Sequence, residues 1–391
     1  MAATFRHCVP GPRFPPTNPR HVPEARESVQ FDPALHLALE DPRFLKMLDG
    51  REARFNMEEE EEEEAFHVKN GKNNGKNNGE NGKNNGRNGG GLAYSAPFRL
   101  LSDEGVRALR SVLLANEQFS TMVPGRIPKC IRGIGYRSKF MRDLGFSPRI
   151  LAHLSRCAGE PITPHGMCSN LSQINFGEVG AGVKVDQWHL DSVPYVMVLL
   201  MSDATDMVGG ELQVARIPGD PRRALRAVQA DKVEAQFIDT VKYPGPGYAI
   251  FMQGSRIAHG VTPVLSAREK RLTVVNSYQS CNPFAPPRTV YRTFKTMPPG
   301  EGEEMAHFEF ARHVAWRVSG QMDYLLKKAD FFGKDKKVAL AGLLSRAAEE
   351  LNRARGLILG ETEEELPYKL DDQKLETVKQ AADSLPSRAK L

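Results

Sequence analysis

Residues 168–280 contain eight short β-rich segments with no helical pattern between them. Apolar and β-branched residues recur there with a period of two, and glycine or proline occupies most of the gaps. Strands that follow one another in this way form antiparallel sheets, so this part predicts an all-β sandwich or barrel. The expected strands are 168–176, 184–191, 195–202, 211–217, 233–242, 248–253, 255–261 and 271–279.

Helical patterns lie on both sides of this β region. Asp32 and Pro33 are typical of a helix N-cap and first helical position, and leucines continue the pattern to Leu48. The predicted fold class is α+β, with an N-terminal helical segment (1–55), a domain (92–300) around the β core and a C-terminal helical region (301–391). Further helices are expected at 101–116, 148–158, 302–329, 335–357 and 371–383.

A polar tract separates the first segment from the domain. Residues 58–64 are seven glutamates, and residues 70–91 hold nine Asn and eight Gly. Such a tract buries nothing that could offset the entropy cost of ordering it, so we expect a disordered insert at 56–91. A tolerated repeat expansion in a surface loop is favoured over an interaction tail.

Composition excludes several classes of protein. The longest apolar run, 193–201, is far shorter than the roughly 20 residues that span a bilayer, so we expect no membrane span. The five cysteines form no CxxC pair, which argues against a disulfide scaffold, a zinc finger or an iron–sulfur site. No aromatic and basic pattern of a nucleic-acid binder is present, and no signal-peptide pattern opens the chain. We therefore expect an intracellular, cytoplasmic protein that binds no nucleic acid.

Three residues of the β region form a metal-ligand set. His189 and Asp191 are two apart at the end of an expected strand, so their side chains share one face. His259 lies on another expected strand. Two imidazoles and one carboxylate are the ligands of a facial triad that leaves coordination positions of Fe(II) open. The alternative is a surface His–Asp pair with an unrelated strand histidine.

Arg271 opens the last expected strand and shares a face with Thr273, Val275 and Ser277. An inward-facing arginine is costly unless an anion meets it, and an adjacent hydroxyl offers a second hydrogen bond. This pair is typical of a carboxylate-binding fork. The alternative is an ion pair between Arg271 and an acidic residue of the chain.

Together these motifs resemble the Fe(II)/2-oxoglutarate-dependent dioxygenases, most of all the prolyl-4-hydroxylase-like and phytanoyl-CoA-hydroxylase-like branches. The resemblance covers about 110 residues, from about 171 to 278. Its parts occur in the family's order at similar spacings. They are His189-x-Asp191, GGEL at 209–212, PGYAIF at 246–251, HGVTPV at 259–264, and Arg271-x-Thr273.

The resemblance implies a double-stranded β-helix (jelly-roll) core flanked by helices, with His189, Asp191 and His259 as ligands of Fe(II). Arg271 would bind the distal carboxylate of 2-oxoglutarate, assisted by Thr273. Many relatives carry a tyrosine on the strand before the HxD motif; here Asn175 or Gln173 would replace it. Residues 92–300 hold 25 basic and 16 acidic residues, which favours entry of a dianionic co-substrate.

The implied activity uses O₂ and 2-oxoglutarate, with ascorbate as a candidate reductant. It oxidises a C–H bond of a small-molecule or peptidyl substrate, by hydroxylation in the first instance, with release of succinate and CO₂. Two alternatives are a sensor or binding module without turnover and a non-haem iron cupin that uses no 2-oxo acid. The flanking helices are candidates for a homodimer contact.

Several other residues have two readings each. We interpret Asp186 as a solvated residue that faces away from Asp191, and Trp188 as packing rather than substrate stacking. The basic insertion at 218–231 is a lid for an anionic substrate or a solvated helical turn. A second basic group is either a substrate contact or surface charge, and it comprises Arg132, Arg137, Lys139 and Arg142.

Overall fold

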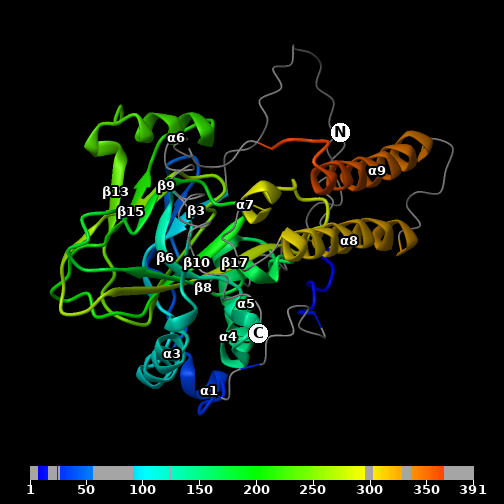
Figure 1. Cartoon of the computed structure of the whole chain (residues 1–391). Helices are drawn as coiled ribbons and strands as arrows, with labels where there is room; N and C mark the ends of the chain where they lie inside the picture. The colour runs from blue at the N-terminus through cyan, green and yellow to red at the C-terminus, as the bar shows by residue number, and fades with distance from the viewer. Residues whose placement is uncertain are drawn as a thin grey trace.

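The chain folds around antiparallel sheets with helices packed outside them (Figure 1). The structure, a computed structural model, describes residues 8–15, 24, 27–55, 91–123, 125–295, 303–327 and 336–364. Every strand pair in it is antiparallel, so the predicted mixture of helices and antiparallel sheet is confirmed. The tract at 56–90 and the expected helix at 371–383 lie outside the described residues.

The larger sheet has four central strands, β14 (Tyr248–Met252), β10 (Tyr195–Leu200), β17 (Arg271–Ser280) and β8 (Gln173–Gly177). Strands from the N-terminal part of the chain extend both edges of this sheet. Beyond β14 lie β3, β1 and β2, and beyond β8 lie β6 and β5. Strands β4 and β7 pair with β14 and β17. The bounds of these outer strands are β1 Phe44–Met47, β2 Glu52–Arg54, β3 Leu92–Ser95, β4 Phe98–Arg99, β5 Thr121–Val123, β6 Ile127–Ile131 and β7 Ile162–Pro164.

The smaller sheet has the order β13–β12–β15–β9. Its members are β13 (Ile238–Val241), β12 (Leu212–Ala215), β15 (His259–Val261) and β9 (Asp186–His189). A separate two-stranded sheet pairs β11 (Val208–Gly209) with β16 (Val264–Ser266). In the chain, β11 directly precedes β12, and β16 directly follows β15. Side chains of the larger and smaller sheets line one shared cavity, so the two sheets face each other across it.

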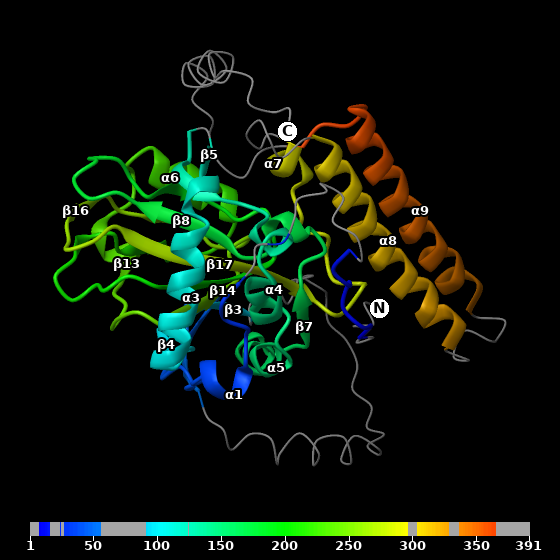
Figure 2. The same ribbon diagram turned by 60° about the horizontal axis from the view of Figure 1, so that its bottom comes forward.

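Alternation along the central strands divides the core into two layers. Met197 and Leu199 of β10 and Val274 of β17 pack with the helices outside the larger sheet. Val196 and Val198 of β10 point the other way and pack with the smaller sheet. Figure 2 shows the three outer helices, α3 (Asp103–Ala115), α4 (Lys139–Gly145) and α5 (Pro148–Ala158), on that outer side. The apolar stripe of α5 buries Ile150 and Leu154 there.

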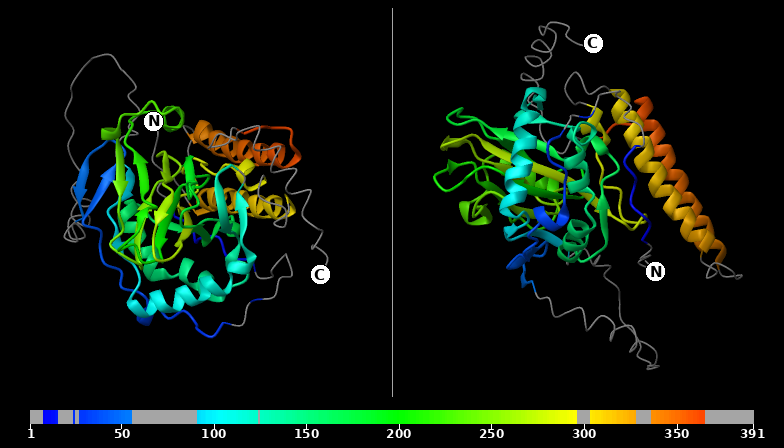
Figure 3. Two further views of the ribbon diagram at one scale, coloured as in Figure 1. Left: turned by 60° about the vertical axis from the view of Figure 1, so that its left-hand side comes forward. Right: turned by 90° about the horizontal axis from the view of Figure 1, so that it is seen from below.

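The C-terminal part is a pair of long helices side by side, α8 (Glu303–Lys327) and α9 (Lys337–Leu359) (Figure 3). It joins the sheets through the short helix α7 (Tyr291–Lys295). The carboxylate of Glu309 on α8 is fully buried and accepts hydrogen bonds from the Ser169 amide and hydroxyl and from the Tyr136 hydroxyl. This carboxylate fixes α8 to the loop that precedes β8.

One predicted helix is wrong. The expected N-cap forms, because Asp32 Oδ1 accepts a hydrogen bond from the Ala34 amide, but helix α1 covers only Pro33–His36. Leu39 then adopts a left-handed backbone (φ 55°), and its amide bonds to the Leu100 carbonyl. Pro42 could not have continued a helix. Residues 44–47, which were expected to be helical, instead form β1, so the described residues of the segment 1–55 are not mainly helical.

The other predicted helices that fall within the described residues, and the eight predicted core strands, lie close to their expected positions, with ends shifted by a few residues. Strand 168–176 begins as a 3-10 turn and becomes β8 only at Gln173. The insertion at 218–231 forms helix α6 (Pro221–Gln229). Sequence analysis missed the strands of 92–164 that widen the larger sheet. Among the described residues, no helix is both long and apolar enough to cross a bilayer.

Candidate metal centre

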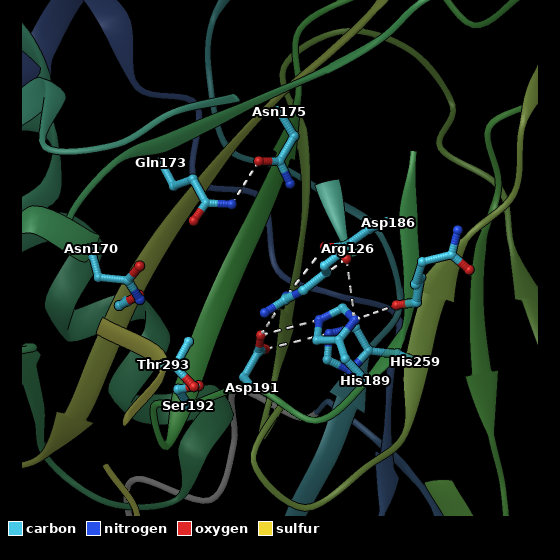
Figure 4. A network of polar contacts seen from close by, with 12 residues as sticks. Arg126, Asn170, Gln173, Asn175, Asp186, His189, Asp191, Ser192, His259 and Thr293 are labelled. Atoms are coloured by element: carbon cyan, nitrogen blue, oxygen red, sulfur yellow. Dashed lines mark hydrogen bonds and ion pairs between the residues drawn. The ribbon is translucent and has the colours of Figure 1, made fainter. Parts of the chain in front are cut away.

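His189, Asp191 and His259 meet at one end of the smaller sheet (Figure 4). His259 of β15 is the register partner of His189 of β9, and Asp191 follows two residues after that strand. Asp191 Oδ1 lies 3.3 Å from His189 Nε2, and Oδ2 lies 3.4 Å from His259 Nε2. One ligand atom of each residue lies within 4.8 Å of the others, which suits a single metal ion. The predicted set is thus brought together.

Both imidazoles are oriented by their second nitrogen. His189 Nδ1 lies 2.6 Å from the Gln187 carbonyl oxygen, and His259 Nδ1 lies 3.0 Å from the Ile257 carbonyl oxygen. Because a carbonyl only accepts, we assign the proton to Nδ1 in each ring. Each Nε2 lone pair then points at the Asp191 carboxylate. Two lone pairs facing two carboxylate oxygens repel one another unless a cation lies between them.

Burial and charge keep Asp191 ionised. Burial alone would raise the pKa of this carboxyl, but His259 and His189 together hold the pKa well below its usual value. Burial, followed by the charge of Arg126, lowers the pKa of His189. Asp191 Oδ2 is buried and accepts no hydrogen bond from any described residue. The charge of Asp191 in turn raises the pKa of His259 against the effect of burial. Asp191 therefore presents an ionised carboxylate, with Oδ1 toward His189 Nε2 and Oδ2 toward His259 Nε2.

Gly254 leaves the space that Asp191 occupies. A Cβ atom at this position would lie 1.9 Å from Asp191 Oδ2. The Gly254 carbonyl also accepts a hydrogen bond of 2.9 Å from the Asp191 amide. Gly254 could not be identified from the sequence. Its contact with Asp191 forms only when the β14–β15 connection folds against the end of β9.

A buried cavity of about 50 Å³ adjoins the three side chains, and Arg271 enters it from β17. Arg271 is 1% exposed, donates from Nη1 to Thr273 Oγ1 at 3.3 Å, and has no hydrogen-bond partner for Nη2 among the described residues. Burial lowers its pKa. The expected face of β17 is confirmed, because Arg271, Thr273, Val275 and Ser277 all line this cavity. No described carboxylate lies within ion-pair distance of the Arg271 guanidinium.

The strand beside β17 places amides at the same cavity. Asn175 of β8 is the register partner of Thr273, and its Oδ1 accepts a hydrogen bond of 2.6 Å from Gln173 Nε2. Asn170 lies farther along and donates to Ser277 Oγ at 2.9 Å. Asn175 and Gln173, the two expected replacements for a tyrosine, both line the cavity (Figure 4).

The interpretation of Asp186 as a solvated residue is wrong. Asp186 is 5% exposed and accepts two hydrogen bonds from Arg126, from Nε at 2.9 Å and from Nη2 at 3.2 Å. A β-bulge is the cause: the pairing of His259 with His189 and of Val261 with Asp186 sets two residues against three. The bulge turns Asp186 toward the face of His189, and no local pattern in the sequence announces it.

The other candidates separate in the structure. Arg132 lines the cavity, whereas Arg137 stacks on Phe119, Lys139 pairs with Asp143, and Arg142 donates to the Gly135 carbonyl. Trp188 packs with a cluster that also includes Leu190 and Leu225 of α6, which agrees with the packing interpretation. Helix α6 is therefore a packed element and not a freely solvated turn.

The chain was also compared with known protein families, sequences and structures. No protein-family model and no curated protein sequence matches the chain. Several solved structures do. The epimerase SnoN of nogalamycin biosynthesis, a non-haem α-ketoglutarate-dependent enzyme, matches at 19% identity and a TM-score of 0.37 over 48% of this chain and 78% of its own.

Two further structures are similar to the same extent. HygX from Streptomyces hygroscopicus, solved with nickel and 2-oxoglutarate, matches at 15% identity and a TM-score of 0.35, over 48% of this chain and 83% of its own. EctD from S. alaskensis matches at 18% identity and a TM-score of 0.36, over 48% and 73%. The non-haem enzymes among these matches are of the class that the motifs resemble.

Proposed function

We propose that the chain is an Fe(II)- and 2-oxoglutarate-dependent dioxygenase that hydroxylates a C–H bond of its substrate. One observation carries this proposal. Two buried polar atoms without partners, Asp191 Oδ2 and Arg271 Nη2, belong to side chains that line the same cavity. The first calls for a cation and the second for an anion. A divalent metal together with a dicarboxylate supplies both.

His189, Asp191 and His259 would hold the iron. Neutral imidazole nitrogens and a hard carboxylate suit a borderline divalent metal, and no thiolate lies in the group. The carbonyls that accept from each Nδ1–H are the usual partners of metal-bound histidines, because they fix the tautomer and the ring orientation. The donor set thus fits the metal that we propose.

Arg271 would bind the distal carboxylate of 2-oxoglutarate. Its guanidinium presents an unpartnered nitrogen in a dry site, and Thr273 Oγ1 lies beside it. Asn175, next to Thr273 in register, offers its amide nitrogen to the same ligand while Gln173 holds its oxygen. These three contacts would replace the tyrosine that many members of the resembled family use.

The bound metal would activate O₂ in a reaction that converts 2-oxoglutarate to succinate and CO₂ and inserts one oxygen atom into a C–H bond of the substrate. The protein's part is binding and shielding. Val196, Val198 and Val275 form the apolar part of the cavity wall, whereas most of the other lining side chains are polar. Phe294 of α7 closes another side.

The proposed catalytic unit is the domain at 92–300, built as a double-stranded β-helix. Support comes from the two sheets that face each other across the cavity and from the ligands at the end of the smaller one. The C-terminal region would act as a buttress, because the Glu309 carboxylate joins α8 to the loop before β8.

The decisive experiment is spectroscopic. Fe(II) and 2-oxoglutarate added without oxygen are expected to give the weak visible metal-to-ligand charge-transfer band of the chelate. His189→Ala should abolish the band, whereas the control His307→Ala, on α8, should keep it. A band that survives in His189→Ala contradicts the assigned metal centre.

Turnover separates the remaining alternatives. With oxygen admitted, succinate should form, and mass spectrometry of a metabolite or peptide library should detect added oxygen. Iron binding without succinate would favour an iron cupin that uses no 2-oxo acid. A charge-transfer band with no turnover of any library would favour a sensor or binding module.

A further inference from the structure

Two larger cavities continue from the metal centre along one side of the chain. The first, of about 520 Å³, is lined by Asp191 itself, by Ser255 and by the segment 287–290. The second, of about 580 Å³, lies between β1, β3 and β12. Pro221 and Arg288 line both cavities, so their walls adjoin. Because Asp191 also lines the small cavity that contains Arg271, the three spaces follow one another around the centre.

The second cavity has an apolar wall. Met47 of β1, Tyr94 of β3, Val214 of β12 and Ile257 contribute to it. Two of its four basic residues form ion pairs, Lys46 with Glu52 and Arg216 with Asp239. In the first cavity, Arg353 pairs with Glu364. Arg222 and Arg256 also line these cavities and are not without interactions, whereas Arg288 makes no hydrogen bond through its side chain and no ion pair with a described residue.

Arg288 is a cation without a counter-ion. It is partly buried, and within the described part of the chain its guanidinium makes no hydrogen bond and no ion pair. Burial lowers its pKa, and Arg256 nearby loses basicity through burial and through the charge of Arg288. A partly buried arginine that forms no ion pair with a described residue favours the binding of an anion.

We propose that the primary substrate is a small organic acid that binds with its anionic group at Arg288 and its apolar part in the second cavity. This inference deepens the proposed function, on which its catalytic meaning rests. Arg288 and Asp191 both line the first cavity, so an acid bound at Arg288 lies at a cavity that borders the candidate metal centre. The apolar wall of Met47, Tyr94 and Val214 stabilises the remainder by burial.

Binding of simple amphiphiles to the metal-free protein tests the inference. Decanoate and decyl phosphate are the anionic probes, and decanol is the neutral one, each measured by isothermal titration calorimetry. The wild-type protein should bind at least one anionic probe at least tenfold more tightly than decanol. Arg288→Met should lose that preference, and Arg288→Lys should keep most of it. The better anionic probe shows whether the site prefers a carboxylate or a phosphate.

Matched variants isolate the two halves of the site. Arg107→Met removes an exposed arginine on α3 and should leave binding unchanged. Met47→Glu places a carboxylate in the second cavity and should weaken anion binding at least tenfold, whereas Met47→Leu should not. An unfolding midpoint near that of wild type confirms that each variant folds. Equal affinity of wild type and Arg288→Met for the anionic probes, or no binding of either anion by wild type, overturns the inference.

The same samples keep the two proposals apart. Arg288→Met should still give the charge-transfer band with Fe(II) and 2-oxoglutarate. If neither Arg288→Met nor the wild-type protein gives the band, the proposed function is contradicted. Selective binding of decanoate or decyl phosphate would in that case still support an organic-acid site.

Discussion

Arg126 and Asp186 form a two-point buried ion pair directly beside the candidate metal ligands. The pair touches both ends of the HxD motif, because Arg126 Nη2 lies 3.6 Å from Asp191 Oδ1 and Asp186 Oδ1 lies 3.4 Å from His189 Nδ1. Of the two Asp191 oxygens, Oδ1 is thus held by positive charge and Oδ2 is left open toward His259. We therefore expect the pair to leave Oδ2 as the oxygen available to a metal ion.

Arg126 is accordingly expected to act as a positioning residue. Arg126→Met should weaken Mn(II) binding by about 10- to 100-fold, the usual effect of losing a partner behind a metal ligand. It should also lower the free energy of unfolding of the metal-free protein by about 3–5 kcal/mol, because Asp186 is left buried and unpaired. Calorimetry with Mn(II) and urea unfolding measure the two effects.

A double variant separates stability from positioning. Arg126→Met with Asp186→Leu removes both charges and should regain most of the stability without regaining metal affinity. Full recovery of Mn(II) binding in the double variant would show that the ion pair is only structural.

Gly254→Ala is expected to damage the metal centre with little effect on the fold. The new methyl group would overlap Asp191 Oδ2, so the carboxylate must turn away from His259. We expect at least a tenfold loss of Mn(II) affinity by calorimetry. Gly245→Ala is the matched control, since nothing lies within 4 Å of a Cβ atom there. Wild-type affinity in Gly254→Ala would contradict the assignment of Asp191 as a ligand.

Arg271→Met should separate co-substrate binding from metal binding. We expect the affinity for 2-oxoglutarate in the presence of Fe(II) to fall at least 100-fold, about 3 kcal/mol, as for loss of a charged partner in a dry site. Mn(II) affinity should stay unchanged. The ligand-free variant should be as stable as wild type or more so, because an uncompensated buried charge has been removed. Strong destabilisation would instead reveal a structural ion pair.

Stability is expected to fall below neutral pH because of buried neutral histidines. His165 accepts from the Met167 amide at Nδ1 and bonds through Nε2 to Thr289 Oγ1, which also bonds to His313 Nε2. Burial lowers the pKa of His165 to about 3. A histidine in the unfolded chain has a pKa near 6.5. As the pH falls through this value, the unfolded chain binds a proton at His165 that the folded chain does not bind. The free energy of unfolding therefore decreases as the pH decreases.

The size of this effect is measurable. Between pH 7.5 and 5.5, His165 alone should cost about 1.4 kcal/mol of stability. Urea unfolding at the two pH values measures the effect. The free energy of unfolding of His165→Gln should decrease by about 1.4 kcal/mol less than that of the wild-type protein. An identical pH dependence for the two proteins would exclude His165 as a source of it.

The grouping of His189, Asp191 and His259 near Arg271 could be predicted because these residues belong to short motifs in the expected strands. Asp186 could not, because the bulge that turns it inward depends on pairing with β15. The helix from Asp32 was overextended because the backbone of Leu39 is fixed by Leu100, a contact between distant residues. Glu309 was missed for the same reason, since its partner Ser169 is 140 residues away. Local periodicity predicts the positions of helices and strands. The pairing of residues that are distant in the chain determines which polar groups are buried.

The direct pairing of β9 with β15 has a consequence for how such a protein can diversify. His189 and His259 sit on hydrogen-bonded neighbours, although 69 positions separate them in the chain. The intervening residues form α6 and much of the wall of the two larger cavities. Insertions in that stretch can reshape what the protein accepts while the two histidines keep their register. The proposed metal-binding geometry and molecular selectivity can therefore drift at separate rates within one chain.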